Sequence, residues 1–522
     1  MKKVKIYDTT LRDGMQAEGV SFSAEDKLQI AQRLDEFEVD YVEGGFPLSN
    51  PKEEEFFARI KDVDFKHAKV AAFGSTRRAG NTVENDPCIG ALMACGAEVV
   101  TLVGKAWDMH VTDVLRCSLD ENIELCADSV AYLVKNGREV VFDAEHFFDG
   151  YKANPEYAMK VLQAAADAGA GTLVLCETNG GALPDEVFAI TEKVCKAFPK
   201  AVVGIHCHND SDCAVANTLA AVRAGARHVQ GTINGLGERT GNANLCTIIP
   251  NLSLKMGYET VGADNIQRLT ELSRYVFEVA NLAPSLNMPY VGESAFAHKG
   301  GLHIDALRKN EKTYEHISPE LVGNERRFLI SELSGASNVL DKLEKKKMIT
   351  DKALARKILS RVQQLENDGY QFETAEASFD LLIKKEMGTY EKTFDLLKYH
   401  IDVERSTSGQ MVTEATVKLQ VDGKAEHVVS EGDGPVNALD SALRKALEPF
   451  YPNIRDMSLI DYKVRVVNAR AGTAARVRVV IESRDQVDMW GTVGVSENII
   501  EASWHALVDS VEYKLLKDKG KI

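Results

Sequence analysis

The sequence predicts an α/β protein built on a (β/α)8 TIM barrel, followed by a small helical subdomain and a C-terminal α+β domain. The barrel is predicted because short apolar runs alternate with amphipathic stretches through roughly the first 260 residues. Strands that alternate with helices of this length indicate βαβ units and a parallel sheet. The C-terminal domain is predicted because one order of strands and helix occurs twice in roughly the last 150 residues.

Eight apolar runs are the expected strands of the barrel, at residues 4–7, 40–43, 69–73, 99–103, 140–142, 172–176, 202–206 and 228–233. The clearest amphipathic stretches between them are 24–37, 120–135, 155–168 and 185–197. Eight βα units within about 250 residues fit a closed barrel better than an open sheet. The glycine-rich fingerprint that a Rossmann fold carries after its first strand is also missing. We therefore expect a catalytic barrel at residues 1–261.

Residues 262–370 differ from the barrel in being helical and rich in loops. Helices are expected at 265–280, 334–345 and 351–364. The polar, glycine-containing stretch 298–315 has too little periodicity for a buried element. We expect this region to be a helical linker and lid that contributes to the active site.

Residues 371–522 contain the internal repeat. Strands are expected at 397–403, 413–421 and 425–430, with a helix at 435–447, and again at 461–467, 475–482 and 487–493, with a helix at 499–515. Such a βββα unit cannot bury its apolar face alone, so two units should pair in a pseudo-twofold domain. The repeat itself is compatible with a purely structural or dimerising domain and with a small-molecule regulatory domain.

Composition excludes several classes of protein. A formal net charge of −16 argues against nucleic acid or an anionic membrane as a partner. No apolar run is long enough to span a bilayer, and the chain reaches its first strand too early to leave room for a signal peptide. The nine cysteines are scattered and odd in number, which does not suit a disulfide framework. We expect a cytoplasmic protein with reduced thiols.

Metal-ligand side chains gather at the carboxyl ends of the expected strands, where barrel enzymes have their active sites. His206 and His208 are two residues apart on a strand, so both point to one face. Asp13, after the first strand, adds a carboxylate, and Asn242, after the eighth, adds an amide oxygen. This set suits Mn²⁺, Mg²⁺, Co²⁺ or Zn²⁺ with positions left for a substrate. The alternative is that one histidine is an ordinary hydrogen-bonded core residue.

Three further polar residues are expected at the same end of the barrel. Arg12 adjoins Asp13 and could stabilise an oxyanion as negative charge develops; alternatively it forms a structural ion pair with Glu43 or Glu145. Glu145 could orient the reacting groups, and the hydroxyl of Thr178 could bind a substrate carboxylate. For Glu145 and Thr178 the alternative is a purely structural role.

Three motifs resemble the signatures of the DRE-TIM metallolyases, the family of 2-isopropylmalate, homocitrate and citramalate synthases. They are residues 8–14 (DTTLRDG), 206–208 (HCH) and 237–242 (GERTGN). The resemblance implies that Asp13, His206 and His208 are metal ligands with Asn242 nearby, and that Arg12 stabilises the oxyanion beside Glu145 and Thr178. It also implies that a histidine and a tyrosine reach the site from the region after the barrel. His303, in the stretch 300–303 (GGLH), and Tyr314 match those two, with His303 as the acid/base residue. Tyr314 could instead be a packing residue.

Two stretches resemble one branch of that family, the citramalate synthases: residues 15–19 (MQAEG) and 42–51 (VEGGFPLSNP). Isopropylmalate synthases more typically carry EQSPG at the first of these places. The resemblance implies condensation of acetyl-CoA with pyruvate and water to give (R)-citramalate and CoA, the entry step of a threonine-independent route to isoleucine. Residues 432–438 (GDGPVNA) resemble the amino-acid-sensing domain of these synthases, which implies a homodimer with isoleucine or leucine as effector.

Three alternatives to this function stay open. A 2-isopropylmalate synthase would use the same residues with 2-oxoisovalerate as acceptor. A hydroxyacyl-CoA lyase would carry a cysteine in the loop after the eighth strand, but residues 237–240 (GERT) contain none. A non-enzymatic amino-acid sensor would have lost its metal ligands, yet Asp13, His206 and His208 are all present.

Overall fold

The computed structural model describes residues 2–329, 352–405, 409, 411–467 and 475–522. These separate into two compact units. The first comprises Met1–Phe296 with Ile317–Arg326, and the second comprises Ala297–His316 with Arg327–Ile522.

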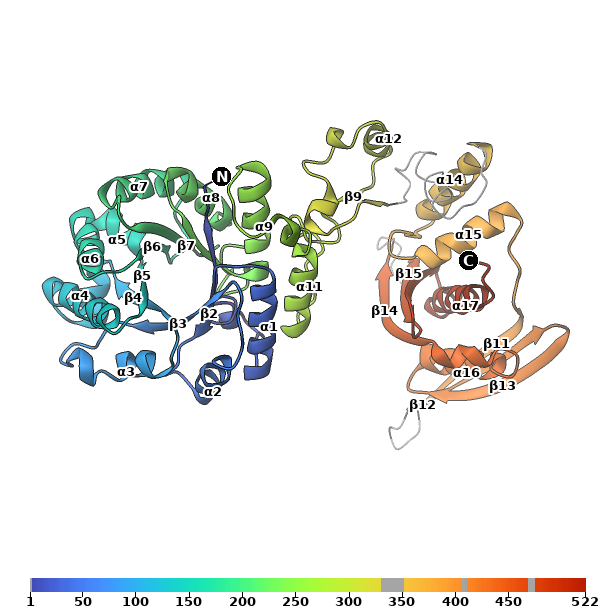
Figure 1. Ribbon diagram of the computed structural model, residues 1–522. Coiled ribbons are helices and arrows are strands. Elements are labelled where there is room, and N and C mark those ends of the chain that lie inside the picture. Colours follow the sequence, from blue (N-terminus) through green and yellow to red (C-terminus); the bar gives the residue numbers. More distant parts are fainter. Residues whose placement is uncertain (1, 330–351, 406–408, 410, 468–474) are drawn as a thin grey trace. The chain divides into compact units, whose positions relative to one another are not determined.

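The first unit contains a closed barrel of eight parallel strands, which confirms the predicted fold (Figure 1). Its strands are β1 (Lys5–Asp8), β2 (Tyr41–Gly45), β3 (Lys69–Ser75), β4 (Val99–Lys105), β5 (Glu139–Glu145), β6 (Thr172–Glu177), β7 (Val202–Cys207) and β8 (His228–Gly231). The strands pair in sequence order, and the barrel closes where β1 pairs with β8, with Lys5 opposite His228.

A ring of helices covers the outside of the barrel (Figure 1). They are α1 (Ala24–Glu36), α2 (Pro51–Ile60), α3 (Pro87–Ala94), α4 (Leu119–Lys135), α5 (Phe147–Ala153), α6 (Pro155–Asp167), α7 (Pro184–Ala197), α8 (Ala214–Ala224) and α9 (Leu245–Pro250). The local sequence determines where several of these helices begin. Ser23 and Asp26 form a reciprocal capping box at α1. Proline stands in the first turn of α2, α3, α6 and α7, where its missing N–H costs nothing.

The inside of the barrel changes from apolar to polar toward the carboxyl ends of the strands. A small apolar cluster fills its middle: Tyr7, Tyr41, Ala71, Val99, Val141, Val174 and Cys176. Side chains two residues apart on a strand point the same way. Since Val141 faces the interior, Asp143 and Glu145 on the same strand face it too, nearer the carboxyl end. The polar end of the barrel is therefore the place for chemistry.

The first helix predicted after the barrel, 265–280, is interrupted. Two helices, α10 (Ala263–Ile266) and α11 (Leu269–Val279), stand in its place. The break lies where Gly323 approaches the chain so closely that a Cβ on it would be 2.1 Å from the carbonyl oxygen of Gln267. The hydroxyl of Thr270 also donates to the carbonyl of Val322 at 2.7 Å. A contact with residues about 55 positions later sets the break, so local periodicity could not reveal it.

The second unit begins with a stretch in which no buried element was expected, and it contains a helix. Strands β9 (Ala297–His298) and β10 (Arg327–Phe328) pair in parallel, and α12 (Gly301–Lys309) lies between them in sequence. Only Ile304 and Leu307 of α12 are buried, which explains its weak apolar pattern. The predicted helix 334–345 lies outside the described residues. The predicted helix 351–364 appears as α14 (Lys352–Asn367), and an unpredicted α15 (Glu376–Met387) follows.

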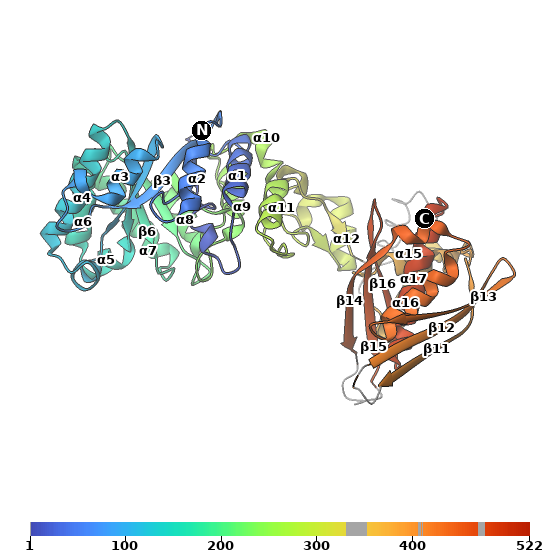
Figure 2. The ribbon, with the colours of Figure 1, turned by 90° about the horizontal axis from the view of Figure 1, so that it is seen from below.

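The duplicated βββα unit is confirmed (Figures 1 and 2). Its first copy is β11 (Asp395–Arg405), β12 (Met411–Val421), β13 (Lys424–Gly432) and α16 (Pro435–Leu447). The second copy is β14 (Ser458–Val466), β15 (Val477–Arg484), β16 (Met489–Ser496) and α17 (Ile499–Asp518). Each copy forms an antiparallel three-stranded sheet with its own helix packed on it, and the two helices also touch each other. Among the described residues, no helix has both the length and the apolar character needed to cross a bilayer.

Candidate active site

A cavity of about 730 Å³ opens at the carboxyl ends of the barrel strands. Six of the residues singled out in the sequence line it: Arg12, Asp13, Glu145, Thr178, His206 and His208. They come from the loop after β1 and from the ends of β5, β6 and β7. The barrel therefore brings together side chains that are up to about 195 positions apart in sequence.

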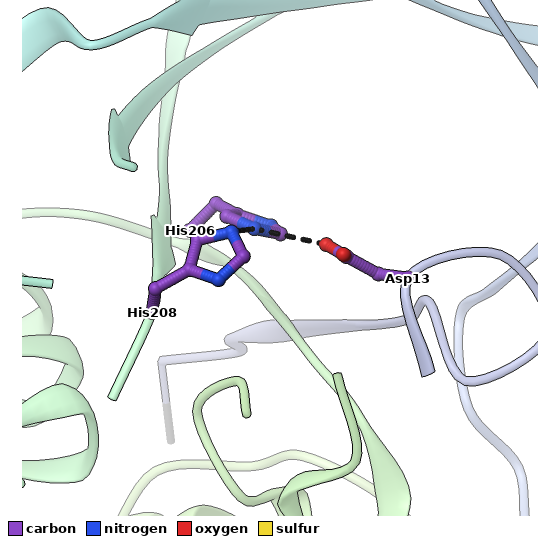
Figure 3. Close-up of side chains that lie close together, drawn as sticks. All are labelled: Asp13, His206 and His208. Carbon is purple, nitrogen blue, oxygen red and sulfur yellow. Dashed lines mark hydrogen bonds and ion pairs between the residues drawn. The ribbon is translucent and has the colours of Figure 1, made fainter. Parts of the chain in front are cut away.

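Three of these side chains converge on one point (Figure 3). The Nε2 atom of His206 lies 3.2 Å from Oδ2 of Asp13 and 3.4 Å from Nε2 of His208. One ligand atom from each of the three residues lies within 4.8 Å of the others, and all three side chains are buried. The two imidazoles meet because residues two apart on β7 face the same side, as the sequence predicts.

The turn after β1 carries Asp13 to this point. The backbone N–H groups of Arg12, Asp13 and Gly14 all donate to the carbonyl oxygen of Thr9. Asp8 stabilises the turn, because its carboxylate accepts from both the N–H and the hydroxyl of Thr10 at 2.9 Å. Burial raises the pKa of Asp8 to about 7, against the opposing effect of these hydrogen bonds. Asp8 therefore shapes the turn, and it is not among the residues that line the cavity.

The donor set fits a divalent cation. Oδ1 of Asn242 is buried and has no hydrogen-bond partner among the described residues. Oδ2 of Asp13 is also buried, and its neighbours are Nε2 of His206 at 3.2 Å and Nη1 of Arg12 at 3.4 Å. Asn242 lies next to His208, with which it forms a backbone bridge, and its amide nitrogen already donates to Leu236. A buried oxygen without a partner is costly, and a cation bound here would satisfy Asn242 and neutralise the charge of Asp13. Carboxylate, imidazole and amide ligands of this kind suit Mg²⁺, Mn²⁺, Co²⁺ or Zn²⁺.

The electrostatics of the site favour the metal-binding protonation state of Asp13 and of His208, but not that of His206. Burial would raise the pKa of Asp13, but Arg12 and His206 hold it well below its ordinary value. Burial and the neighbouring His206 lower the pKa of His208 to about 4. Burial also opposes the charged form of His206, yet its contact with Asp13 raises its pKa overall. Near neutral pH, Asp13 is thus ionised and His208 neutral, as ligation requires.

Arg12 is held firmly at the edge of the cavity. Its Nε donates to Oε2 of Glu43 at 2.7 Å, and Nη1 lies 3.4 Å from Oδ2 of Asp13. Its guanidinium carbon lies 4.1 Å from the ring centre of Phe73. The ion pair with Glu43 that the sequence left open is therefore present, and it fixes the guanidinium beside the proposed metal ligands without removing it from the cavity.

Glu145 and Thr178 face the same cavity with their own partners. The carboxylate of Glu145 forms an ion pair with Lys105. The hydroxyl oxygen of Thr178 accepts from the backbone N–H of His146 at 3.0 Å, so its own hydrogen is left to donate elsewhere. His146 adopts a left-handed conformation (φ 56°), unusual for a residue other than glycine, in the step from β5 to α5.

Comparisons with known proteins agree over the whole chain. An HMGL-like family model matches residues 3–276, a homocitrate synthase post-HMGL domain-like model matches 290–369, and the LeuA allosteric (dimerisation) domain matches 373–515. The chain is 56% identical over 521 residues to the (R)-citramalate synthase of Aquifex aeolicus, with 99% of both chains covered. The chain belongs to the (R)-citramalate synthase family. The chain is also 55% identical over 522 residues to the (R)-citramalate synthase of Geobacter sulfurreducens, again with 99% of both chains covered. A probable 2-isopropylmalate synthase of Methanopyrus kandleri is 32% identical over 509 residues and 98% of each chain.

Three polar residues of this citramalate synthase family member were missed from the sequence. Lys105 holds Glu145, and Asp143 and Gln230 extend the site behind His206. A signal for Asp143 was present, since it stands two residues before Glu145 on the same strand and must face the same way. Gln230 on β8 had no such neighbour among the residues singled out; it faces the interior together with His228, two residues earlier, whose ring centre lies 5.2 Å from that of Tyr7.

The two residues expected from the region after the barrel belong to the second unit. The rings of His303 and Tyr314 stack with their centres 4.0 Å apart and their planes 20° from parallel. Both side chains are exposed within that unit. The stack holds the side chain from α12 and the side chain from the turn after it together.

Proposed function

We propose that this protein condenses acetyl-CoA with pyruvate and water to give (R)-citramalate and CoA. The observation that carries the proposal is the convergence of Asp13, His206 and His208 beside Arg12, in a chain 56% identical to an (R)-citramalate synthase. The second candidate is 2-isopropylmalate synthesis with 2-oxoisovalerate as acceptor. It is favoured only by the 32% identity to a probable 2-isopropylmalate synthase.

The proposed metal ligands are Asp13, His206 and His208, with the amide oxygen of Asn242 adjacent. A divalent cation held there supplies Lewis-acid polarisation of the 2-oxoacid's carbonyl group. Mn²⁺, Mg²⁺, Co²⁺ and Zn²⁺ all suit the donor set.

The protein's own side chains supply binding and charge stabilisation. Arg12, fixed by Glu43, directs its guanidinium at an oxygen that gains negative charge during carbon–carbon bond formation. The free hydroxyl hydrogen of Thr178 donates to the 2-oxoacid's carboxylate. Glu145, paired with Lys105, orients the reacting groups at the cavity wall. These roles place the acceptor at the polar end of the barrel.

The methyl group of acetyl-CoA must lose a proton before it can attack. We assign this step to His303 as the general base, with the stacked Tyr314 fixing its ring. Water then cleaves the thioester of the condensed product and releases CoA. Since hydrolysis of the thioester is strongly favourable, the overall reaction is effectively irreversible.

The three regions of the chain receive separate roles in this proposal. Residues 1–261 form the catalytic barrel, 262–370 the linker and lid that bring His303, and 371–522 a regulatory domain. The match of residues 373–515 to the LeuA allosteric (dimerisation) domain supports a homodimer controlled by isoleucine or leucine. Feedback control of this kind suits a committed step toward isoleucine.

The identity of the product tests this function. Acetyl-CoA labelled with ¹³C in both acetyl carbons is incubated with pyruvate, Mn²⁺ and the protein, and the products are separated by chiral chromatography and mass spectrometry. The proposal predicts (R)-citramalate carrying two ¹³C atoms. Labelled 2-isopropylmalate formed from 2-oxoisovalerate, with no citramalate from pyruvate, would favour the second candidate and overturn the first.

A further inference from the structure

A chain of two hydrogen bonds crosses the inside of the barrel and ends on a proposed metal ligand. Nε2 of Gln230 donates to Oδ1 of Asp143 at 3.0 Å. On its other side, Oε1 of Gln230 lies 2.9 Å from Nδ1 of His206. The three side chains come from β5, β8 and β7, and their exposed fractions are only 3%, 0% and 5%. We propose that Asp143 determines, through the amide of Gln230, which ring nitrogen of His206 is free to bind the metal. This inference rests on the proposed metal site.

The donor and acceptor properties of the three groups leave one consistent arrangement. Burial and the nearby Glu43 raise the pKa of Asp143 to about 7. Above that pH the carboxylate is ionised and can only accept, so Asp143 must face the NH₂ group of Gln230. The amide oxygen of Gln230 then faces Nδ1 of His206 and can only accept, so Nδ1 carries the hydrogen. In the neutral ring, the form that binds a metal, the lone pair of His206 is then on Nε2. That is the atom that lies 3.2 Å from Asp13 and 3.4 Å from His208.

The reversed arrangement would block ligation. If the amide of Gln230 were flipped, its oxygen would face the carboxylate of Asp143, and two acceptors would be in contact in a buried place. The NH₂ group would then face Nδ1 of His206, which would have to accept, so the ring hydrogen would move to Nε2. A hydrogen on Nε2 points at Asp13 and occupies the metal-binding lone pair. Asp143 prevents this state.

His206 and His208 differ in whether their Nδ1 atom has a hydrogen-bond partner. Nδ1 of His208 is buried and has no hydrogen-bond partner in the described part of the chain. The relay from Asp143 therefore acts on His206 alone. His206 is also the ring whose Nε2 lies closest to Asp13, so fixing it fixes the centre of the ligand set.

Packing alone does not account for Asp143. Val141, two residues earlier on β5, fills the barrel with an apolar side chain. A carboxylate buried in the next layer costs stability relative to such a residue. Within the described part of the chain, its one hydrogen bond to another side chain reaches Gln230 on the far strand β8, and it also lines the cavity. Asp143 is thus a positioning residue that acts on the metal site through Gln230.

Metal affinity tests the relay without any substrate. Metal-stripped protein is titrated with Mn²⁺ in competition with a fluorescent chelator, at mildly alkaline pH. Gln230→Met keeps the volume and removes both hydrogen bonds, and it should weaken Mn²⁺ binding about 10- to 100-fold, the usual effect of losing a partner of a metal-bound histidine. Asp143→Asn should weaken it too, because an amide there can donate to Gln230 and permit the flipped state.

Two further variants separate orientation from packing. Gln230→Glu keeps an acceptor opposite Nδ1 of His206 and should recover at least part of the affinity that Gln230→Met loses. Asp35→Asn serves as the matched control. Asp35 is also buried, but it accepts the backbone N–H groups of residues 66–68, away from the cavity. This control should lower the thermal unfolding temperature and leave the Mn²⁺ dissociation constant unchanged.

The position of the ring hydrogen of His206 can be measured on the wild-type protein, so this test does not depend on whether a variant folds. Imidazole ¹⁵N chemical shifts of metal-free wild-type protein, recorded at alkaline pH where the ring carries one proton, should show the hydrogen on Nδ1. A hydrogen on Nε2 would overturn the relay, as would Gln230→Met protein that binds Mn²⁺ with wild-type affinity or Gln230→Glu protein that binds as weakly as Gln230→Met. Since neither experiment uses acetyl-CoA or a 2-oxoacid, failure of the proposed reaction would leave these outcomes unaffected.

Discussion

Nε of Arg12 donates a 2.7 Å hydrogen bond to the carboxylate of Glu43, a side chain with no exposed surface. The same carboxylate accepts from the hydroxyls of Tyr7 at 2.8 Å and Thr9 at 2.6 Å. Glu43 is thus fixed by three donors, and it fixes the guanidinium in turn. A cation held rigidly at a place where negative charge develops contributes most to catalysis, because nothing has to reorganise during the reaction.

Arg12→Lys should lower kcat about 10²- to 10³-fold, the usual effect of losing one preorganised oxyanion donor. A lysine offers a single ammonium group, which cannot both pair with Glu43 and reach the cavity as the forked guanidinium does. The Mn²⁺ affinity of the variant should stay within a few-fold of wild type. The assay is CoA release at saturating pyruvate, with the exposed Arg59→Lys on α2 as control. An Arg12→Lys enzyme with wild-type kcat would remove Arg12 from the mechanism.

Asp13→Asn should abolish activity by removing the anionic ligand of the metal site. The substitution keeps the shape of the side chain but loses its charge, so Mn²⁺ binding should weaken about 100-fold or more. Titration of metal-stripped protein followed by calorimetry measures this directly. Asp62→Asn, at an exposed position after α2, is the matched control. Unchanged Mn²⁺ affinity in the Asp13 variant would mean that the proposed ligand set is wrong.

Thr178→Val should raise the KM for pyruvate about tenfold or more, whereas Thr178→Ser should behave like wild type. Valine has the shape of threonine but loses a hydrogen bond to a charged carboxylate, which is worth about 1.5–3 kcal/mol. It also leaves the N–H of His146 without its acceptor, so the thermal unfolding temperature should fall. Steady-state kinetics and thermal unfolding of both variants check the two effects. Equal KM values for the valine and serine variants would assign Thr178 a structural role only.

Glu512→Gln should stabilise the second unit at alkaline pH. Burial raises the pKa of Glu512 to about 7 against the opposing charge of Lys385, while the unfolded chain releases the same proton near pH 4.5. Between these values the folded state holds more protons, so stability falls as pH rises. The substitution should remove a penalty on the order of 3 kcal/mol at about pH 8, at 1.4 kcal/mol per pKa unit, and change little near pH 4.

Urea unfolding of the full chain at both pH values, followed by tryptophan fluorescence, measures this difference. Trp490 and Trp504 both lie in the second unit and report on it. Glu497→Gln, at an exposed position just before α17, is the control and should show no pH-dependent gain. A Glu512→Gln protein with no greater stability than wild type at about pH 8 would contradict the account.

The fold could be predicted from the sequence because its signals are local. Each barrel strand is an apolar run, and the two βββα copies repeat the same order of elements. The convergence of Asp13, His206 and His208 could be predicted as well, since the two histidines share a face on β7 and Asp13 follows β1. All of these follow from periodicity and from the rule that barrel sites lie at the carboxyl ends of strands.

The remaining features depend on contacts that only the closed barrel creates. Asp143 and Gln230 are 87 positions apart, and the hydrogen bond between them exists because β5 and β8 enclose the same interior. Glu43 could be proposed as a partner of Arg12 but not distinguished from Glu145, since both stand at strand ends. The break between α10 and α11 is set by the later residue Gly323. Helix α12 was not predicted because so little of it is buried that its apolar residues show no helical period.

The most direct test of the central claim is the ratio of kcat/KM for pyruvate to that for 2-oxoisovalerate, measured as CoA release from acetyl-CoA with Mn²⁺ and repeated with chelator. The account predicts a strong preference for pyruvate, loss of activity with chelator and its return when Mn²⁺ is restored. Preference for 2-oxoisovalerate, or full activity with the metal removed, would contradict it.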